Sequence, residues 1–262
     1  MGLISFVTIK GRRLEYQLIA ASDAKAPTLI LLHEGLGSLA QWRDFPARIA
    51  EATGCATLVY SRLGYGQSDK LTEARRVDYM HVEALETLPA LRDALAIADP
   101  VLVGHSDGAS IALVHAGARR WPVRGLILEA PHVFVEDVTV ASIAAAKEAY
   151  RTSDLRARLG RYHRDVDGAF RGWNDIWLDP EFRAWNIEDY LPAITWPVLV
   201  IQGEDDEYGT PAQLDAIREK VAGTVETLLL KDCKHSPHRD QPDATLAAMT
   251  RFAAAIQASD QT

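Results

Sequence analysis

Eight short apolar stretches, each of strand length, recur along the chain. The first two alternate apolar and polar positions, whereas the later ones are continuously apolar. Alternation is typical of a strand with one solvated side, and a continuous run is typical of a strand buried on both faces of a parallel sheet. The predicted strands are residues 4–9, 14–19, 28–33, 56–60, 100–104, 125–129, 198–202 and 225–230.

Helical patterns separate the later strands, and they occupy residues 39–52, 77–98, 107–120 and 211–221. Ser38 and Thr210 stand where N-caps are expected. Strands that alternate with helices predict right-handed βαβ units and therefore an α/β fold with an open, doubly wound, mostly parallel sheet. The first two strands, joined by Lys10-Gly11-Arg12, predict an N-terminal antiparallel hairpin at one edge.

One region interrupts this alternation. Residues 132–192 contain no strand-like run but hold helical segments such as 142–152 and an aromatic-rich stretch. An insertion at this point usually covers the site at the strand ends. We therefore predict a core formed by residues 1–131 and 193–262 and a helical cap over 132–192. The alternative is an ordinary crossover helix with long loops.

Composition and charge narrow the class of protein. The 262 residues are 48% apolar and carry 28 Lys and Arg against 36 Asp and Glu, a net charge of −8. Without a basic cluster, neither nucleic acid nor an anionic membrane surface is an expected partner. The N-terminus does not read as a signal peptide, no apolar run is long enough to span a membrane, and only two cysteines occur. A cytoplasmic location is expected.

The strongest chemical motif is Gly104-His105-Ser106-Asp107-Gly108, which lies between a predicted buried strand and a helix rich in small residues. This G-x-S-x-G arrangement is the nucleophile elbow, in which the serine stands on a strained turn. The start of the following helix points backbone N–H groups toward a developing oxyanion. The alternative is a glycine-rich packing turn without chemistry.

A serine nucleophile needs a histidine base and a carboxylate that orients it. Two later strands are followed by such residues: Glu204, Asp205 and Asp206 after the first, and His235 and His238 after the second. Because active sites of open α/β sheets lie at the carboxyl ends of the strands, both segments are well placed. From position alone, Asp205 remains an alternative acid and His238 an alternative base.

Five segments, in this order, make the chain resemble a capped serine hydrolase of the α/β-hydrolase fold superfamily, similar to esterases and carbon–carbon bond hydrolases. They are LLHEGLGS, YSRLGYGQS, GHSDG, PVLVIQGEDDEYGTP and CKHSPHRDQPD. The resemblance implies Ser106 as nucleophile, Asp206 as acid and His235 as base. It also implies an oxyanion hole formed by the backbone N–H groups of Asp107 and Gly35.

Two carboxylates depart from the pattern of the family. Glu34 stands where many relatives have glycine, and Asp107 stands where an apolar residue commonly follows the nucleophile. A free negative charge beside a developing oxyanion would oppose catalysis. The simplest interpretation is that both side chains are tied into salt bridges, with Arg62 as one candidate partner of Glu34. Alternatively, the side chain of Glu34 points away from the oxyanion, and that of Asp107 stabilises the dipole of the helix that it begins.

No metal or cofactor is expected. His33-Glu34 lacks the second histidine of H-E-x-x-H, His235-x-x-His238 has no companion ligands, and no dinucleotide or Walker motif is present. The expected partner is a small-molecule substrate, and the choice between monomer and homodimer stays open.

The expected activity is hydrolysis of a small carboxylic ester through an acyl-enzyme. The candidates for the substrate pocket are Glu34, His132, Trp173, Trp177 and Trp185. Aromatic residues at such spacing are also typical of a cap core, so that alternative is retained. Further alternatives are a carbon–carbon hydrolase of a diketone, a cofactor-free perhydrolase or haloperoxidase-like enzyme, and a small-molecule binding module on the same fold.

Overall fold

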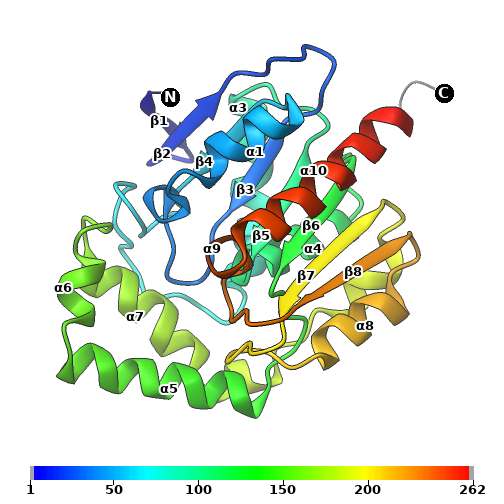
Figure 1. Cartoon of the computed structure of the whole chain (residues 1–262). Helices are drawn as coiled ribbons and strands as arrows, with labels where there is room; N and C mark the ends of the chain where they lie inside the picture. The colour runs from blue at the N-terminus through cyan, green and yellow to red at the C-terminus, as the bar shows by residue number, and fades with distance from the viewer. Residues whose placement is uncertain (1–2, 260–262) are drawn as a thin grey trace.

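The computed structural model describes residues 3–259, which fold around one eight-stranded sheet (Figure 1). The order of the strands is β1-β2-β4-β3-β5-β6-β7-β8. Only the pairs β1/β2 and β2/β4 are antiparallel, and all other pairs are parallel. The predicted fold class and the antiparallel edge are confirmed. The strands are β1 Ile4–Ile9, β2 Arg12–Ile19, β3 Leu29–Leu32, β4 Thr57–Tyr60, β5 Val101–His105, β6 Gly125–Glu129, β7 Val198–Gly203 and β8 Val225–Leu230.

Helices cover both faces of the sheet. Successive residues of the central strands are buried in two different cores: Leu29 and Leu31 of β3 face one, and Ile30 and Leu32 face the other. Helices α1 (Phe45–Thr53) and α10 (Pro242–Ser259) pack on the first face (Figure 1). Helices α3 (Leu88–Ala94), α4 (Asp107–Gly117) and α8 (Ala212–Lys220) pack on the second. Burial on both sides is the physical reason for the continuously apolar strands.

Two predicted helices are interrupted in the structure. The predicted helix 39–52 is a short 3₁₀ segment, η1 (Leu39–Trp42), followed by α1, with Arg43 at a φ of 55° between them. The predicted helix 77–98 consists of α2 (Tyr79–Val82), a π-helical turn η2 (Glu83–Thr87) and α3. Pro89 follows this turn and has no N–H for an intrahelical hydrogen bond, which explains the widened turn.

The segment between β6 and β7, residues 130–197, is called the helical insertion below. It contains α5 (Asp137–Thr152), α6 (Leu155–Leu159), α7 (Val166–Trp177), η3 (Pro180–Ala184) and η4 (Glu188–Ala193). Figure 1 shows α5, α6 and α7 together at one end of the sheet. The location of the helical insertion agrees with the interruption expected over residues 132–192. The division into a core and a cap stays a prediction, and residues 1–2 and 260–262 of that core lie outside the described residues.

A short helix and a long one complete the path of the chain toward the C-terminus. The loop that follows β8 leads into α9 (Pro237–Asp240), and α10 begins two residues later. This loop therefore lies at the same end of the sheet as the helical insertion (Figure 1).

Candidate active site

Ser106 stands on a sharp turn between β5 and α4. Its backbone has a φ of 54° and a ψ of −117°, which a residue with a side chain adopts only under strain. The flanking glycines make the turn possible because a Cβ at Gly104 would lie 2.4 Å from the carbonyl oxygen of Gly108, and one at Gly108 would lie 2.0 Å from that of Leu32. The sharp turn predicted around Ser106 therefore has a steric cause.

Three side chains from three different loops form one hydrogen-bonded array. Nε2 of His235 is 2.9 Å from Oγ of Ser106, and Nδ1 of His235 is 2.8 Å from Oδ1 of Asp206. A carboxylate oxygen only accepts, so Nδ1 carries a proton and donates it to Asp206. When Nε2 carries no proton, it can accept the hydroxyl proton of Ser106. The Ser106 residue is 6% exposed, and the Asp206 side chain is 1% exposed. This array therefore lies in a site largely closed to solvent.

Asp206, rather than Asp205, is the carboxylate that contacts His235. Its Oδ1 also accepts the backbone N–H of Tyr208 at 2.8 Å. Burial alone would raise the pKa of Asp206, but the charge and hydrogen bond of His235 outweigh it and hold this pKa below its usual range. Asp205 is exposed to solvent instead.

His238 is engaged elsewhere. Both its Nδ1 and its backbone N–H are within 2.9 Å of Oε2 of Glu129, the last residue of β6, and its ring lies 4.5 Å from that of Trp42. The buried Glu129 carboxylate has a lowered pKa because His238 outweighs the opposing effect of burial. These contacts make His238 a structural residue and leave His235 as the histidine that reaches Ser106.

The loop after β3 is held by Arg62. The guanidinium donates to the carbonyl oxygens of His33 at 2.6 Å and Glu34 at 3.0 Å. The backbone N–H of Arg62 donates to Nε2 of His33, so the other ring nitrogen carries the proton and donates to the carbonyl of Glu34 at 2.7 Å. Gly35 follows directly, and a Cβ there would lie 3.2 Å from Oδ1 of Asp107. The two segments expected to form an oxyanion hole are therefore neighbours.

The carboxylate of Asp107 is fully enclosed. It accepts hydrogen bonds from the hydroxyl of Tyr79 and from Nε1 of Trp177 at 3.2 Å, and it lies 3.7 Å from the guanidinium of Arg62. Burial and the charge of Asp107 raise the pKa of Tyr79 well above its usual value, so Tyr79 remains a donor. The contact with Arg62 agrees with the interpretation that Asp107 is tied into a salt bridge.

Glu34 has different partners from the one considered from the sequence. Its Oε2 lies 3.5 Å from Nδ1 of His105, and its Oε1 lies 3.6 Å from the guanidinium of Arg239. Arg62 touches only the backbone oxygen of Glu34, because its guanidinium faces Asp107. Both unusual carboxylates are therefore paired, each with its own cations.

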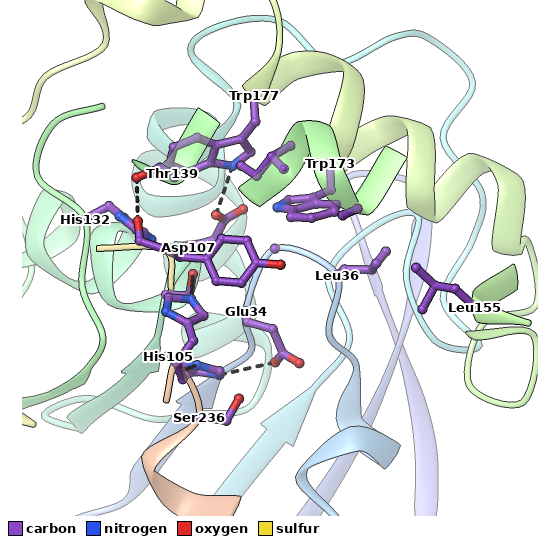
Figure 2. A pocket seen from close by; sticks show the side chains of 16 residues that line it. Glu34, Leu36, His105, Asp107, His132, Thr139, Leu155, Trp173, Trp177 and Ser236 are labelled. Carbon is purple, nitrogen blue, oxygen red and sulfur yellow. Dashed lines mark hydrogen bonds and ion pairs between the residues drawn. The ribbon is translucent and has the colours of Figure 1, made fainter. Parts of the chain in front are cut away.

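A cavity of about 190 Å³ opens directly above Ser106. Figure 2 shows the side chains around it. His132, Trp173 and Trp177 border it as expected from the sequence, together with Glu34, Gly35 and Asp107. Trp185 does not line it, which makes this part of the pocket prediction wrong. Its ring stacks on Phe182 at 5.4 Å and lies in the core of the helical insertion.

A model of the alpha/beta hydrolase family matches residues 29–248. The chain belongs to the alpha/beta hydrolase family.

Individual members of the family that resemble this hydrolase have different activities. The 2-succinyl-6-hydroxy-2,4-cyclohexadiene-1-carboxylate synthase of Klebsiella pneumoniae (strain 342) is 26% identical over 260 residues, covering 87% of this chain and 94% of that one. A proline iminopeptidase of Lactobacillus helveticus (strain DPC 4571) is 29% identical over 276 residues, covering 90% and 93%. A solved proline iminopeptidase of Mycobacterium smegmatis has a TM-score of 0.77 at 20% identity, covering 98% and 100%. The family therefore leaves the substrate of this hydrolase open.

Sequence reasoning missed several residues of the site in this alpha/beta hydrolase. Tyr208 borders the cavity, and its ring lies 4.7 Å from that of His235. Its position two residues after the acid was a usable signal. Ile143 and Leu155, from α5 and α6, also border the cavity. They could not be found, because nothing in an amphipathic helix says which buried side chain faces a ligand rather than a neighbour.

Within residues 3–259, no group of three or more His, Cys, Asp or Glu side chains is arranged to hold a metal ion. In the same range, no helix combines the length and the apolar character needed to cross a bilayer.

Proposed function

We propose that this protein is a serine hydrolase that cleaves small carboxylic esters through an acyl-enzyme. The observation that carries the proposal is the hydrogen-bonded array of Ser106, His235 and Asp206 at the floor of a cavity. A serine, a histidine and a carboxylate in this order of contact are the groups that acyl transfer requires.

The first step is attack on the ester carbonyl. Oγ of Ser106 forms a bond to the carbonyl carbon while its proton passes to Nε2 of His235, 2.9 Å away. The imidazolium that forms donates from Nδ1 to Asp206, whose charge stabilises it. The proton then passes from Nε2 to the leaving alcohol oxygen as the carbon–oxygen bond breaks. Water, activated by the same histidine, then hydrolyses the acyl-serine and releases the acid.

The negative charge that develops on the carbonyl oxygen needs donors fixed in advance. We assign this role to the backbone N–H groups of Asp107 and Gly35. Arg62 supports it by binding the carbonyl oxygens of His33 and Glu34, which fixes the peptide units just before Gly35. It also compensates the charge of the Asp107 carboxylate, which would otherwise oppose the oxyanion.

The cavity favours a small neutral acyl group. Its volume of about 190 Å³ is close to that of a cavity that accepts benzene, about 150 Å³. Leu36, Ile143 and Leu155 make its far side apolar. Glu34 and Asp107 border it, but both are paired with cations of the protein, so neither is free to bind the charged amino terminus of a peptide. This favours an ester over the substrates suggested by the name of the iminopeptidases.

The test is turnover of p-nitrophenyl acetate, butyrate and octanoate together with labelling by a fluorophosphonate. We expect turnover of the two shorter esters and a label on Ser106. The Ser106→Ala variant should lose about four to six orders of magnitude in kcat/KM and all labelling. Ser22→Ala, which removes the hydroxyl of an exposed serine that does not border the cavity, is the matched control and should retain both.

Two outcomes would contradict the proposal. A Ser106→Ala variant with near-native ester turnover would remove the nucleophile from its role. Hydrolysis of a vinylogous diketone, with no ester turnover by the native chain, would replace the ester by a carbon–carbon bond as the substrate.

A further inference from the structure

Glu34 and His105 are a buried pair that the proposed chemistry does not use directly. Glu34 belongs to the loop after β3, just before Gly35, and His105 is the last residue of β5, just before Ser106. His105 is 1% exposed, and the side chain of Glu34 is 17% exposed. Figure 2 shows the pair below the cavity, with the carboxylate of Glu34 turned toward the ring of His105. The pair therefore joins the loop that contains Gly35 to the strand that precedes Ser106.

His105 also reaches the loop of the general base. Its Nε2 lies 2.7 Å from the backbone carbonyl oxygen of His235. A carbonyl oxygen only accepts, so Nε2 carries a proton and donates it. The other nitrogen, Nδ1, has no hydrogen-bond partner within normal distance and faces Oε2 of Glu34 at 3.5 Å. One imidazole ring thus connects the loop of Gly35 to the loop of His235.

We propose that Glu34 and His105 are positioning residues, which hold the oxyanion loop and the backbone of His235 in register with Ser106. This inference rests on the proposed function. Neither residue transfers a proton or bonds to the substrate in it; they act only through Gly35, Ser106 and His235.

The charge states of the pair agree with this geometry. Burial lowers the pKa of His105, but the nearby carboxylate of Glu34 outweighs this effect and leaves the pKa above its usual value. Burial raises the pKa of Glu34, but His105 and Arg239 together hold it well below its usual range. Each member of the pair therefore favours the charged form of the other, and charged partners attract each other more strongly than neutral groups would.

Other charged and titratable groups face His105. The ring of His238 lies 5.1 Å away and that of His235 5.3 Å away. The carboxylate of Glu129 adds to the raised pKa of His105, whereas the charge of His105 adds to the lowered pKa of His132. Four titratable side chains therefore influence or contact His105, and one of them, His235, belongs to the proposed triad.

Removing one member of the pair should have a different effect from removing both. In His105→Gln the carboxylate of Glu34 loses its imidazolium partner, and an uncompensated negative charge favours the protonated form of a nearby histidine. The acid limb of the pH profile of fluorophosphonate labelling should therefore move up by about 0.5–1 pH unit. The double variant Glu34→Gln/His105→Gln carries neither charge and should return the limb to within about 0.3 pH unit of the native position.

The rate should fall in both single variants. Glu34→Gln and His105→Gln should each lower kcat for p-nitrophenyl butyrate by about 10- to 100-fold, since a misplacement of about 1 Å near the reacting atoms has an effect of this size. KM should change by less than about threefold, because neither substitution alters the apolar side chains of Leu36, Ile143 and Leu155 that line the cavity. Glu83→Gln is the matched control: Glu83 is also a buried carboxylate, it accepts from Tyr60 at 2.7 Å, and it does not border the cavity. It should retain the native kcat and pH profile.

The experiment separates positioning from mere stabilisation. If Glu34→Gln lowers only the melting temperature, with kcat and the pH profile equal to those of Glu83→Gln, the inference is overturned. Should His105→Gln fail to fold, Glu34→Gln decides alone, since its residue lies on a partly exposed loop. Failure of the proposed function looks different, because then Ser106→Ala itself retains turnover and labelling.

Discussion

The carboxyl ends of the strands and the helical insertion contribute to the same cavity in different ways. Three side chains lie within a few residues of the carboxyl end of a strand, where the register of the sheet fixes their distances: Ser106, Asp206 and His235. From the insertion come side chains such as Trp173, which meet the cavity from helices whose packing is mostly internal. The difference predicts that the rate of the chemical step depends on residues at the carboxyl ends of the strands and that substrate choice depends on the helical insertion.

The largest expected effect on the rate comes from a residue at the carboxyl end of a strand. Asp206→Asn should lower kcat/KM for p-nitrophenyl butyrate by about 10³- to 10⁴-fold, because an amide favours the wrong tautomer of His235. Asp205→Asn, a neighbouring exposed carboxylate, should change it by less than about threefold. Steady-state kinetics at pH 8 on both variants gives the comparison. A larger loss in Asp205→Asn would mean that the acid is one position earlier than we propose.

The helical insertion should respond in stability and in substrate choice, and two tryptophans separate the two effects. Trp173 borders the cavity, whereas Trp185 stacks on Phe182 away from it. Each change to alanine should lower the free energy of unfolding by about 3–5 kcal/mol, since both indoles are more than nine-tenths buried. Only Trp173→Ala should enlarge the cavity and improve octanoate relative to butyrate.

The measurement is a urea titration combined with the ratio of kcat/KM for the two esters. The labelling rate of Ser106 by a small fluorophosphonate serves as the control and should stay within about threefold of the native rate in both variants. If the ratio changes equally in both variants, or in neither, the cavity wall does not select the acyl chain.

The smallest expected effect is a pH dependence of stability that both regions share. Burial is the main cause that lowers the pKa of His115, in α4, to about 4 and that of His132, after β6, to about 3. An unfolded imidazole titrates near about 6.5, so the unfolded chain binds more protons than the folded one below that pH. Each histidine should therefore cost about 2 kcal/mol of stability between pH 7 and pH 5.

The same window contains one group of opposite sign. The raised pKa of His105 favours the folded state as the pH falls, so the net loss should be smaller than the sum for His115 and His132. Urea titrations at pH 7, 6 and 5 check this, and His132→Gln should flatten the dependence by about 2 kcal/mol. A dependence that is equally steep in this variant would show that His132 is not neutral in the folded chain.

The sequence predicted the strands and the order of the site motifs because both depend on local constraints. Strands buried on both faces need continuous apolar runs, and the elbow at Ser106 needs small neighbours, so each leaves a short readable pattern. What remained out of reach depends on partners distant in the chain. Arg62 was considered for Glu34, yet its guanidinium faces Asp107, and Trp185 was placed at the cavity although it stacks on Phe182. No local pattern says which of two buried partners a long side chain selects.

The contact between Gly35 and Trp173 limits how this protein can be redesigned. A Cβ at position 35 would lie 2.2 Å from Cδ1 of the indole, so the ring of α7 occupies the space that a side chain there would need. An insertion grafted from a relative would therefore fit only if it leaves the same space above the loop after β3. Conversely, a loop taken from a relative with a larger residue at this position would displace α7 and the wall it forms. Chimaeras of this enzyme should exchange the two segments together.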